Sequence, residues 1–238
     1  MTVWILAALL AFFVKGVCGF ANTLIFTTML SFGSSNANIS PVELVLGYPT
    51  NAILAWRERK SIRWRIVLPL TAFMLLGNIP GVLFLKNADA GAVKLAFGVL
   101  IVFLGAEMLL RERASAKREL PKAAGAVTAV LSGLLCGLYG IGALLGAYMS
   151  RITEDSHAFK GNLCFVFWAE NTFRVILYAA GGLLTADVLK QAVLLAPFML
   201  AGLFLGIWSS RFLRESAVKK IVIVMLIVSG IALIFNSL

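Results

Sequence analysis

Ionisable side chains inside long apolar segments are the residues of this sequence best placed to do chemistry. Four lie well inside such segments: Lys15, Glu107, Glu170 and Arg174. Glu107 is close to the end of its segment, where water would solvate it. A charge within a membrane is costly, so the other three indicate a substrate or proton pathway. Lysine and arginine side chains bind anions, and Glu170 is our candidate for proton coupling.

The same residues also have structural explanations. Lys15 could extend its ammonium group to the membrane interface. Glu170 and Arg174 are four residues apart, on one helix face, so they could neutralise each other without contacting a substrate. Asn51 and Asn171 occupy corresponding positions in the two halves of the chain. They either line a cavity or form an interhelical hydrogen bond.

A glycine-rich motif interrupts two of the apolar segments. Its copies are Gly16-Val17-Cys18-Gly19-Phe20-Ala21-Asn22 and Gly137-Leu138-Tyr139-Gly140-Ile141-Gly142. A helix that restarts after such a break has free backbone N–H groups and a positive dipole end, which suit a small anion. The alternative is that the glycines only let helices pack closely. The expected substrate-binding residues are Lys15, Gly19, Phe20, Ala21, Asn22, Asn51, Tyr139, Gly140, Ile141, Gly142, Asn171 and Arg174.

The composition is that of an integral membrane protein. Of the 238 residues 61% are hydrophobic and 13% charged, and the mean hydropathy is +0.95. A soluble domain needs far less apolar surface. The N-terminal segment lacks the basic region and cleavage site of a signal peptide, so we expect it to be retained. Cys18, Cys136 and Cys164 lie within apolar segments without metal-ligand spacing, so we expect neither a disulfide nor a metal site.

The charged loops indicate how the chain crosses the membrane. The apolar segments are 2–33, 39–56, 66–85, 92–110, 123–150, 159–181, 188–210 and 217–236. If 123–150 crosses once, the two sides receive 11 and 8 basic loop residues; if it forms a hairpin, they receive 16 and 3. The positive-inside rule favours the hairpin, and it explains the net charge of +10 without nucleic acid. Two half-helices meeting near the membrane midplane fit the length better than one tilted, kinked helix.

The two halves of the chain resemble each other. A shift of 125 residues aligns Gly77 with Gly202 and Gly81 with Gly206. A shift of 121 residues aligns the two glycine motifs. Internal repeats are a recurring plan of transporters, with the substrate site at the repeat interface.

We therefore expect an all-α integral membrane protein with two inverted four-helix repeats. Each repeat consists of a re-entrant or broken helix hairpin and three transmembrane helices, and eight straight spans are the alternative. Residues 1–238 form a single membrane domain. Repeat one covers about 1–110, a cytoplasmic linker covers 111–122, and repeat two covers about 123–238.

The chain resembles the TauE/SafE sulfite exporter family, also called the four-toluene sulfonate uptake permease family, over essentially its whole length. The resemblance rests on Lys15 to Phe20, on Asn51, on Arg63-Trp64-Arg65 before Pro69, and on Gly137 to Gly142. It implies a multi-pass protein of the bacterial inner membrane. It also implies secondary transport of a small anion such as sulfite, a sulfonate or sulfoacetate.

The chain departs from the family pattern in two places. The family often has Gly-Gly-Pro where this chain has Gly142-Ala143-Leu144, and glycine is common where this chain has Ala21. Both departures bear on the substrate more than on the fold.

Two other functions remain as alternatives: a passive anion channel and a membrane assembly subunit without a substrate. The sequence contains no His-Glu-x-x-His, Gly-x-Ser-x-Gly or Walker motif, so we expect no enzyme activity and no cofactor. The expected partners are a small anionic substrate and membrane lipid, without nucleic acid. A homo-oligomer, the identity of the anion and the direction of transport stay open.

Overall fold

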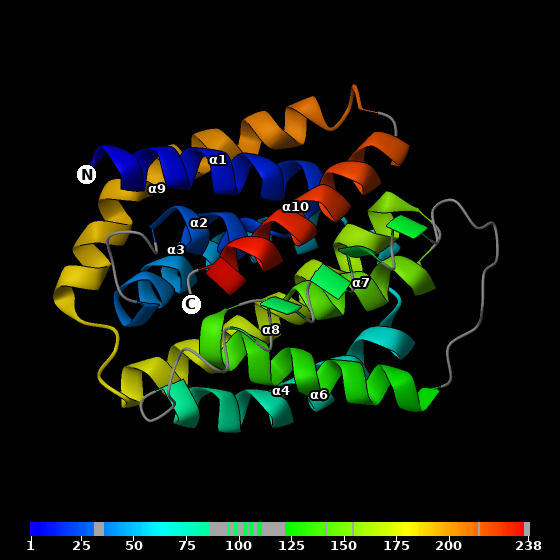
Figure 1. Ribbon diagram of the computed structural model, residues 1–238, viewed down its shortest axis with the longest axis horizontal. Coiled ribbons are helices and arrows are strands. Elements are labelled where there is room, and N and C mark those ends of the chain that lie inside the picture. The colour runs from blue at the N-terminus through cyan, green and yellow to red at the C-terminus, as the bar shows by residue number, and fades with distance from the viewer. Residues whose placement is uncertain are drawn as a thin grey trace.

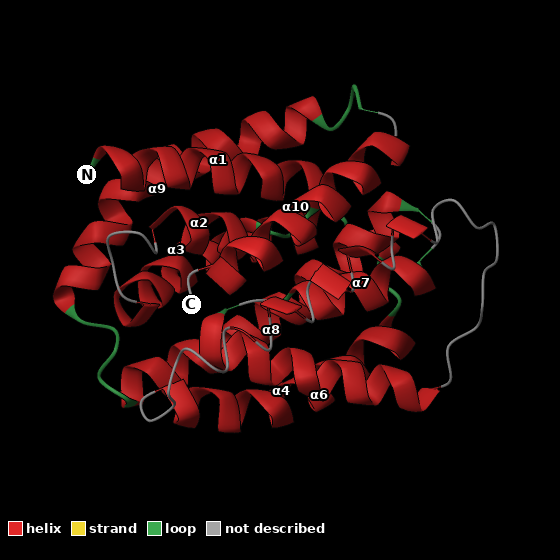
Figure 2. Ribbon diagram, viewed as in Figure 1, coloured by secondary structure: helices red, strands yellow, loops and turns green. Residues whose placement is uncertain are grey.

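The structure, a computed structural model, is a bundle of helices (Figure 1). It describes residues 1–30, 36–85, 95, 98, 99, 102, 103, 105, 106, 109, 110, 122–140, 142–153, 155–213 and 215–235. Throughout these residues the regular structure is helical, without strands (Figure 2). The predicted all-α class is therefore confirmed.

The helices follow the apolar segments. They are α1 (Thr2–Cys18), α2 (Asn22–Leu30), α3 (Asn36–Arg57), a 3₁₀ turn (Arg59–Ser61), α4 (Trp64–Leu85), α6 (Lys122–Tyr139), α7 (Ala143–Ile152), α8 (Ser156–Ala180), α9 (Ala186–Ser209) and α10 (Glu215–Phe235). Among the described residues, Trp64–Leu83, Ser156–Ala180 and Ala186–Ser209 are long and apolar enough to cross a membrane. Glu107 and most of the predicted segment 92–110 lie outside the described residues.

Both glycine motifs end a helix at their second glycine. Gly19 has φ 87° and its N–H donates to Lys15 O at 2.6 Å, and Gly140 has φ 70° and donates to Cys136 O at 2.8 Å. This left-handed residue after the last turn is a common way to end a helix, and glycine adopts it at little cost. The prediction that both segments are broken is confirmed. We call residues 19–21 the first break, and Gly140 with Gly142 the second.

The arms on either side of each break differ in length. The arms of the first hairpin have 17 and 9 residues, and those of the second have 18 and 10. A 17-residue helix is about 26 Å long, which is most of the bilayer core of about 30 Å. The prediction of two half-helices is therefore wrong for the first arm of each pair, and only α2 and α7 are half-helices.

Three helix pairs organise the bundle. α1 packs against α9, α4 packs against α6, and α3 packs against α8 between them (Figure 1). Glycines set the spacing of the first two pairs. A Cβ on Gly16 would overlap the backbone of α9 at Gly206, and a Cβ on Gly137 would overlap the backbone of α4 at Gly81. Close packing is thus correct for the first glycine of each motif, whereas the second glycine ends the helix.

The loop ends of the bundle agree with a hairpin at 123–150. Oε2 of Glu58, in the turn after α3, lies 2.8 Å from Nδ1 of His157 in α8. The ends of α7 and α9 lie at this same end, and the N-terminus and the turn between α8 and α9 lie at the opposite one (Figure 1). A single crossing by 123–150 would separate the Arg57–Arg65 loop from residues 151–160, yet their side chains touch.

Replacing Gly206 by valine should force α1 and α9 apart. A Cβ on Gly206 would lie 2.0 Å from the carbonyl oxygen of Phe13, and overpacking of this kind costs about 1–3 kcal/mol. We expect a lower thermal unfolding midpoint in detergent. Leu205, the exposed neighbour on α9, provides a matched control, and Leu205→Val should leave the midpoint unchanged. An unchanged midpoint for Gly206→Val would contradict close packing of this pair.

Candidate functional site

A small cavity lies where the two breaks meet α3 and α8. Its volume is about 30 Å³. We call it the central cavity. It is lined by Lys15, Phe20, Ala21, Asn22, Thr23, Leu24, Glu43, Asn51, Cys136, Gly140, Gly142, Phe167, Glu170, Asn171 and Arg174.

Most of the residues that we expected to bind substrate come together here. The central cavity includes Lys15, Phe20, Ala21, Asn22, Asn51, Gly140, Gly142, Asn171 and Arg174, together with the proton-coupling candidate Glu170. Gly19 turns the chain next to this cavity, with the side chain of Lys160 against it. Ile141 lies outside the described residues, as does the side chain of Tyr139.

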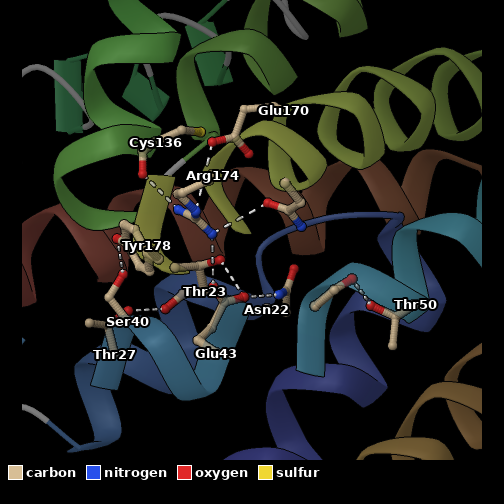
Figure 3. Close-up of polar contacts among 12 residues, drawn as sticks. Asn22, Thr23, Thr27, Ser40, Glu43, Thr50, Cys136, Glu170, Arg174 and Tyr178 are labelled. Carbon is tan, nitrogen blue, oxygen red and sulfur yellow. Dashed lines mark hydrogen bonds and ion pairs between the residues drawn. The ribbon is translucent and has the colours of Figure 1, made fainter. Parts of the chain in front are cut away.

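Arg174 lies at the centre of the polar contacts (Figure 3). Its side chain is almost fully buried, and its guanidinium lies 3.6 Å from Oε2 of Glu43 and 3.8 Å from Oε1 of Glu170. Nη1 donates to the carbonyl of Cys136 at 2.6 Å, and Nη2 donates to Oδ1 of Asn171 at 3.3 Å. The pairing of Glu170 with Arg174 is confirmed, but the arginine is shared with a second carboxylate.

Glu43, the second carboxylate, was missed from the sequence. It is 2% exposed, and its Oε1 accepts hydrogen bonds from Asn22 Nδ2 at 2.5 Å and Thr23 Oγ1 at 2.8 Å. The carboxylate therefore lies at the N-terminus of α2, where the helix dipole favours negative charge. In the sequence, Glu43 stands near the start of the apolar segment 39–56, where an acidic residue resembles part of a solvated helix end. Because α3 begins at Asn36, Glu43 is about two turns into the helix.

Glu170 is bound to a different helix. Its Oε1 accepts a hydrogen bond from Nδ2 of Asn78, a fully buried residue of α4 that the sequence analysis also missed. Oδ1 of Asn78 has no hydrogen-bond partner in the part of the chain that the structure describes. The two carboxylates beside Arg174 are thus held by separate elements, α2 for Glu43 and α4 for Glu170.

Lys15 supplies the second cation of the central cavity. It is 1% exposed, so the interfacial position considered from the sequence is wrong. Its ammonium lies 5.9 Å from the ring centre of Phe12, and no hydrogen bond or ion pair to it occurs among the described residues. With Arg174, Glu43 and Glu170, it brings the formal charge of the cavity lining to zero.

Asn51 and Asn171 face the central cavity from α3 and α8. Oδ1 of Asn171 accepts from Arg174 on its own helix. Oδ1 of Asn51 has no hydrogen-bond partner among the residues that are described. Lining the cavity is therefore the better of the two explanations for this pair.

Disulfides and metal-binding clusters are both absent among the described residues. Cys18, Cys136 and Cys164 are buried and free. The described residues include no group of three histidine, cysteine or acidic side chains that could hold a metal ion. Cys164 is nevertheless close to the first break, where its thiol donates to the carbonyl of Gly19 at 3.2 Å.

Apolar helices of membrane-spanning length around two broken helices and a buried charged cavity are the features of an integral membrane protein. The chain belongs to the sulfite exporter TauE/SafE family, whose family model matches residues 4–233. The resemblance seen in the sequence is thereby confirmed over nearly the whole chain. No curated protein and no solved structure matches it.

Replacing Ala21 by glycine should stabilise the first break. Ala21 has φ 74°, a conformation that costs a residue with a Cβ about 1–2 kcal/mol, whereas glycine loses roughly 0.5–1 kcal/mol of chain entropy. We expect a slightly higher thermal unfolding midpoint in detergent. Gly140→Ala should lower it, because an added Cβ would lie 2.9 Å from Nη1 of Arg174. A lower midpoint for Ala21→Gly would show that the backbone at Ala21 is not strained.

Proposed function

We propose that this protein is a secondary transporter of small anions in the bacterial inner membrane. Its substrate would be sulfite, a sulfonate, sulfoacetate or a related organic anion. The observation that supports this most directly is the burial of Arg174 and Lys15 in one cavity between two helix breaks. Buried cations that line a cavity in a membrane protein indicate a substrate pathway.

The proposed architecture is a pair of inverted repeats, residues 1–110 and 123–238, joined by a linker at 111–122. It is supported by two equivalent helix contacts between the halves, α1 with α9 and α6 with α4. A Cβ on Gly202 of α9 would overlap the carbonyl of Leu9 on α1, and a Cβ on Gly77 of α4 would overlap the carbonyl of Val130 on α6. Gly77 and Gly202 are 125 residues apart, and Leu9 and Val130 are 121 residues apart, as in the sequence alignment.

The substrate anion would bind between Arg174 and Lys15, with the polar side chains of Asn51 and Asn171 beside it. The N-terminus of α2 already has an anion, the carboxylate of Glu43. Glu43 therefore acts as a resident counter-ion when no substrate is bound. A substrate carboxylate, sulfite or sulfonate group would compete with it for Arg174.

The charge balance of the central cavity supports coupling to protons. Its two cations and two carboxylates are balanced, so an incoming anion leaves an excess negative charge in a site with little water. Uncompensated buried charge is strongly unfavourable. Uptake of a proton by Glu170 or Glu43 restores the balance. The anion and the proton would then cross the membrane together.

The burial of the central cavity supports a carrier over a channel. Lys15, Glu170 and Arg174 of its lining are each 1% exposed, whereas the walls of an open pore are in contact with water. In the proposed cycle, each half moves relative to the other around Arg174, as in other transporters with inverted repeats.

Replacing Arg174 by lysine should remove substrate binding. An ammonium keeps the charge but cannot reproduce the guanidinium contacts to Cys136, Asn171 and both carboxylates. We expect roughly tenfold or greater loss of affinity in a thermal-shift titration with sulfite, ethanesulfonate and sulfoacetate. Arg59→Lys, on the surface, is the matched control. Unchanged affinity in Arg174→Lys would exclude Arg174 as a substrate contact.

Counterflow in proteoliposomes separates this proposal from its alternatives. A carrier shows faster uptake when the same anion is present on the other side, and a passive channel does not. A membrane assembly subunit shows neither uptake nor a thermal shift with any of these anions.

Replacing Glu170 by glutamine should uncouple anion flux from the pH gradient. The amide leaves the lining one unit more positive, so the anion binds without a proton. Flux in proteoliposomes should then be the same with and without an imposed pH gradient. Glu43→Gln tests the other carboxylate in the same way, and Glu58→Gln, outside the central cavity, is the control. A response to the gradient in Glu170→Gln that equals the parent's would remove this role from Glu170.

A further inference from the structure

A second and larger cavity lies at the loop end of the bundle where α3 ends and α8 begins. Its volume is about 240 Å³. We call it the vestibule. It is lined by Gly16, Leu54, Arg57, Glu58, Ser156, His157, Lys160, Ile207, Ser210, Arg211 and Leu213.

The wall of the vestibule is positively charged. It includes three basic side chains, Arg57, Lys160 and Arg211, and one carboxylate, Glu58. The carboxylate is already engaged, because its Oε2 lies 2.8 Å from Nδ1 of His157 and its Oε1 lies 3.5 Å from Nε of Arg57. An anion that enters the vestibule therefore meets a net positive potential.

Lys160 is the residue of this wall most suited to bind an anion. It is 9% exposed, and the described residues provide no hydrogen bond or ion pair to its ammonium. A largely buried ammonium is poorly hydrated, so a small anion at this position would stabilise its charge.

Adjacent residues of α1 line the vestibule and the central cavity. Gly16 lines the vestibule, and the preceding residue, Lys15, lines the central cavity. The side chain of Lys160 covers Gly19, where an added Cβ would lie 2.9 Å from its Cγ. Cys164, one turn along α8, hydrogen-bonds the carbonyl of Gly19. The first break thus separates the vestibule from the central cavity. Lys160 contacts the break on the vestibule side, and Lys15, just before the break, lines the central cavity.

We propose that the vestibule is a second anion-binding site, in which Lys160 holds a small oxyanion such as a sulfonate before it passes the first break. Onward transfer to Lys15 and Arg174 rests on the proposed transport function, whereas binding in the vestibule does not. The positive wall raises the local concentration of anions, as charged clefts do for their ligands.

Reaction rates of a cysteine in the vestibule test this proposal without any measurement of transport. Ser210→Cys places a thiol on the vestibule wall. The thiol is labelled with anionic sulfonatoethyl methanethiosulfonate or with its cationic trimethylammonium counterpart. We expect the ratio of anionic to cationic rates to exceed that of a free thiol, and Lys160→Gln to lower it roughly fivefold. The parent protein reports any background from its buried cysteines.

Arg59→Gln is the matched control for surface charge. Arg59 lies in the 3₁₀ turn after α3, with its Cζ 4.7 Å from the ring centre of Trp56. It does not line the vestibule. This variant should leave the rate ratio unchanged. A ratio that Lys160→Gln leaves unchanged, or that Arg59→Gln lowers equally, would overturn the proposal. Thermal midpoints near the parent's show that each variant is folded.

Protection by a ligand separates this proposal from the transport function. Ethanesulfonate should slow labelling of Ser210→Cys when Lys160 is present and should have at least threefold less effect in Lys160→Gln. This result in a protein without counterflow would support the vestibule site and contradict only the transport function. Counterflow without any such protection would contradict only the vestibule site.

Discussion

The fold depends on one buried guanidinium. Arg174 is almost inaccessible to solvent, so its charge has to be balanced within the protein. Glu43 and Glu170 provide that balance, and each is held in turn by a polar side chain of another helix, Asn22 of α2 and Asn78 of α4. Removal of one partner from a buried ion pair typically costs about 3–5 kcal/mol. The cluster therefore adds polar links between α2, α3, α4 and α8 to their apolar contacts.

Glycines bring the breaks to this cluster in two different ways. Gly16 and Gly137 let α1 and α6 approach the backbones of α9 and α4, which sets where the long arms lie. Gly19 and Gly140, three residues later, end those arms in a left-handed conformation. A helix that is tightly packed up to its last turn delivers its end to a defined place. The breaks can thus face Arg174 without long side chains to hold them.

The helical class, the two helix breaks and many of the residues around the central cavity were predictable from local sequence. Charged loops indicated a hairpin at 123–150, and the glycine motifs indicated most of the residues around the central cavity. Glu43, Asn78 and Lys160 were not predictable, because each acquires its role from a residue far away in the sequence. An acidic residue near the start of an apolar segment resembles a solvated helix end until its partner, Arg174, is known. The unequal helix lengths were missed because Gly19 and Gly140 lie past the middle of hairpins that run from Thr2 to Leu30 and from Lys122 to Ile152.

The two cavities differ in charge, and the difference supports the proposed carrier. The vestibule has an excess of basic side chains, so it attracts anions at any time. The central cavity is balanced while Glu43 and Glu170 are charged, so it gains nothing from an anion alone. In the proposed cycle, an anion that collects beside Lys160 moves inward only when a carboxylate beside Arg174 is neutralised. That requirement would make the first break a selective barrier by charge.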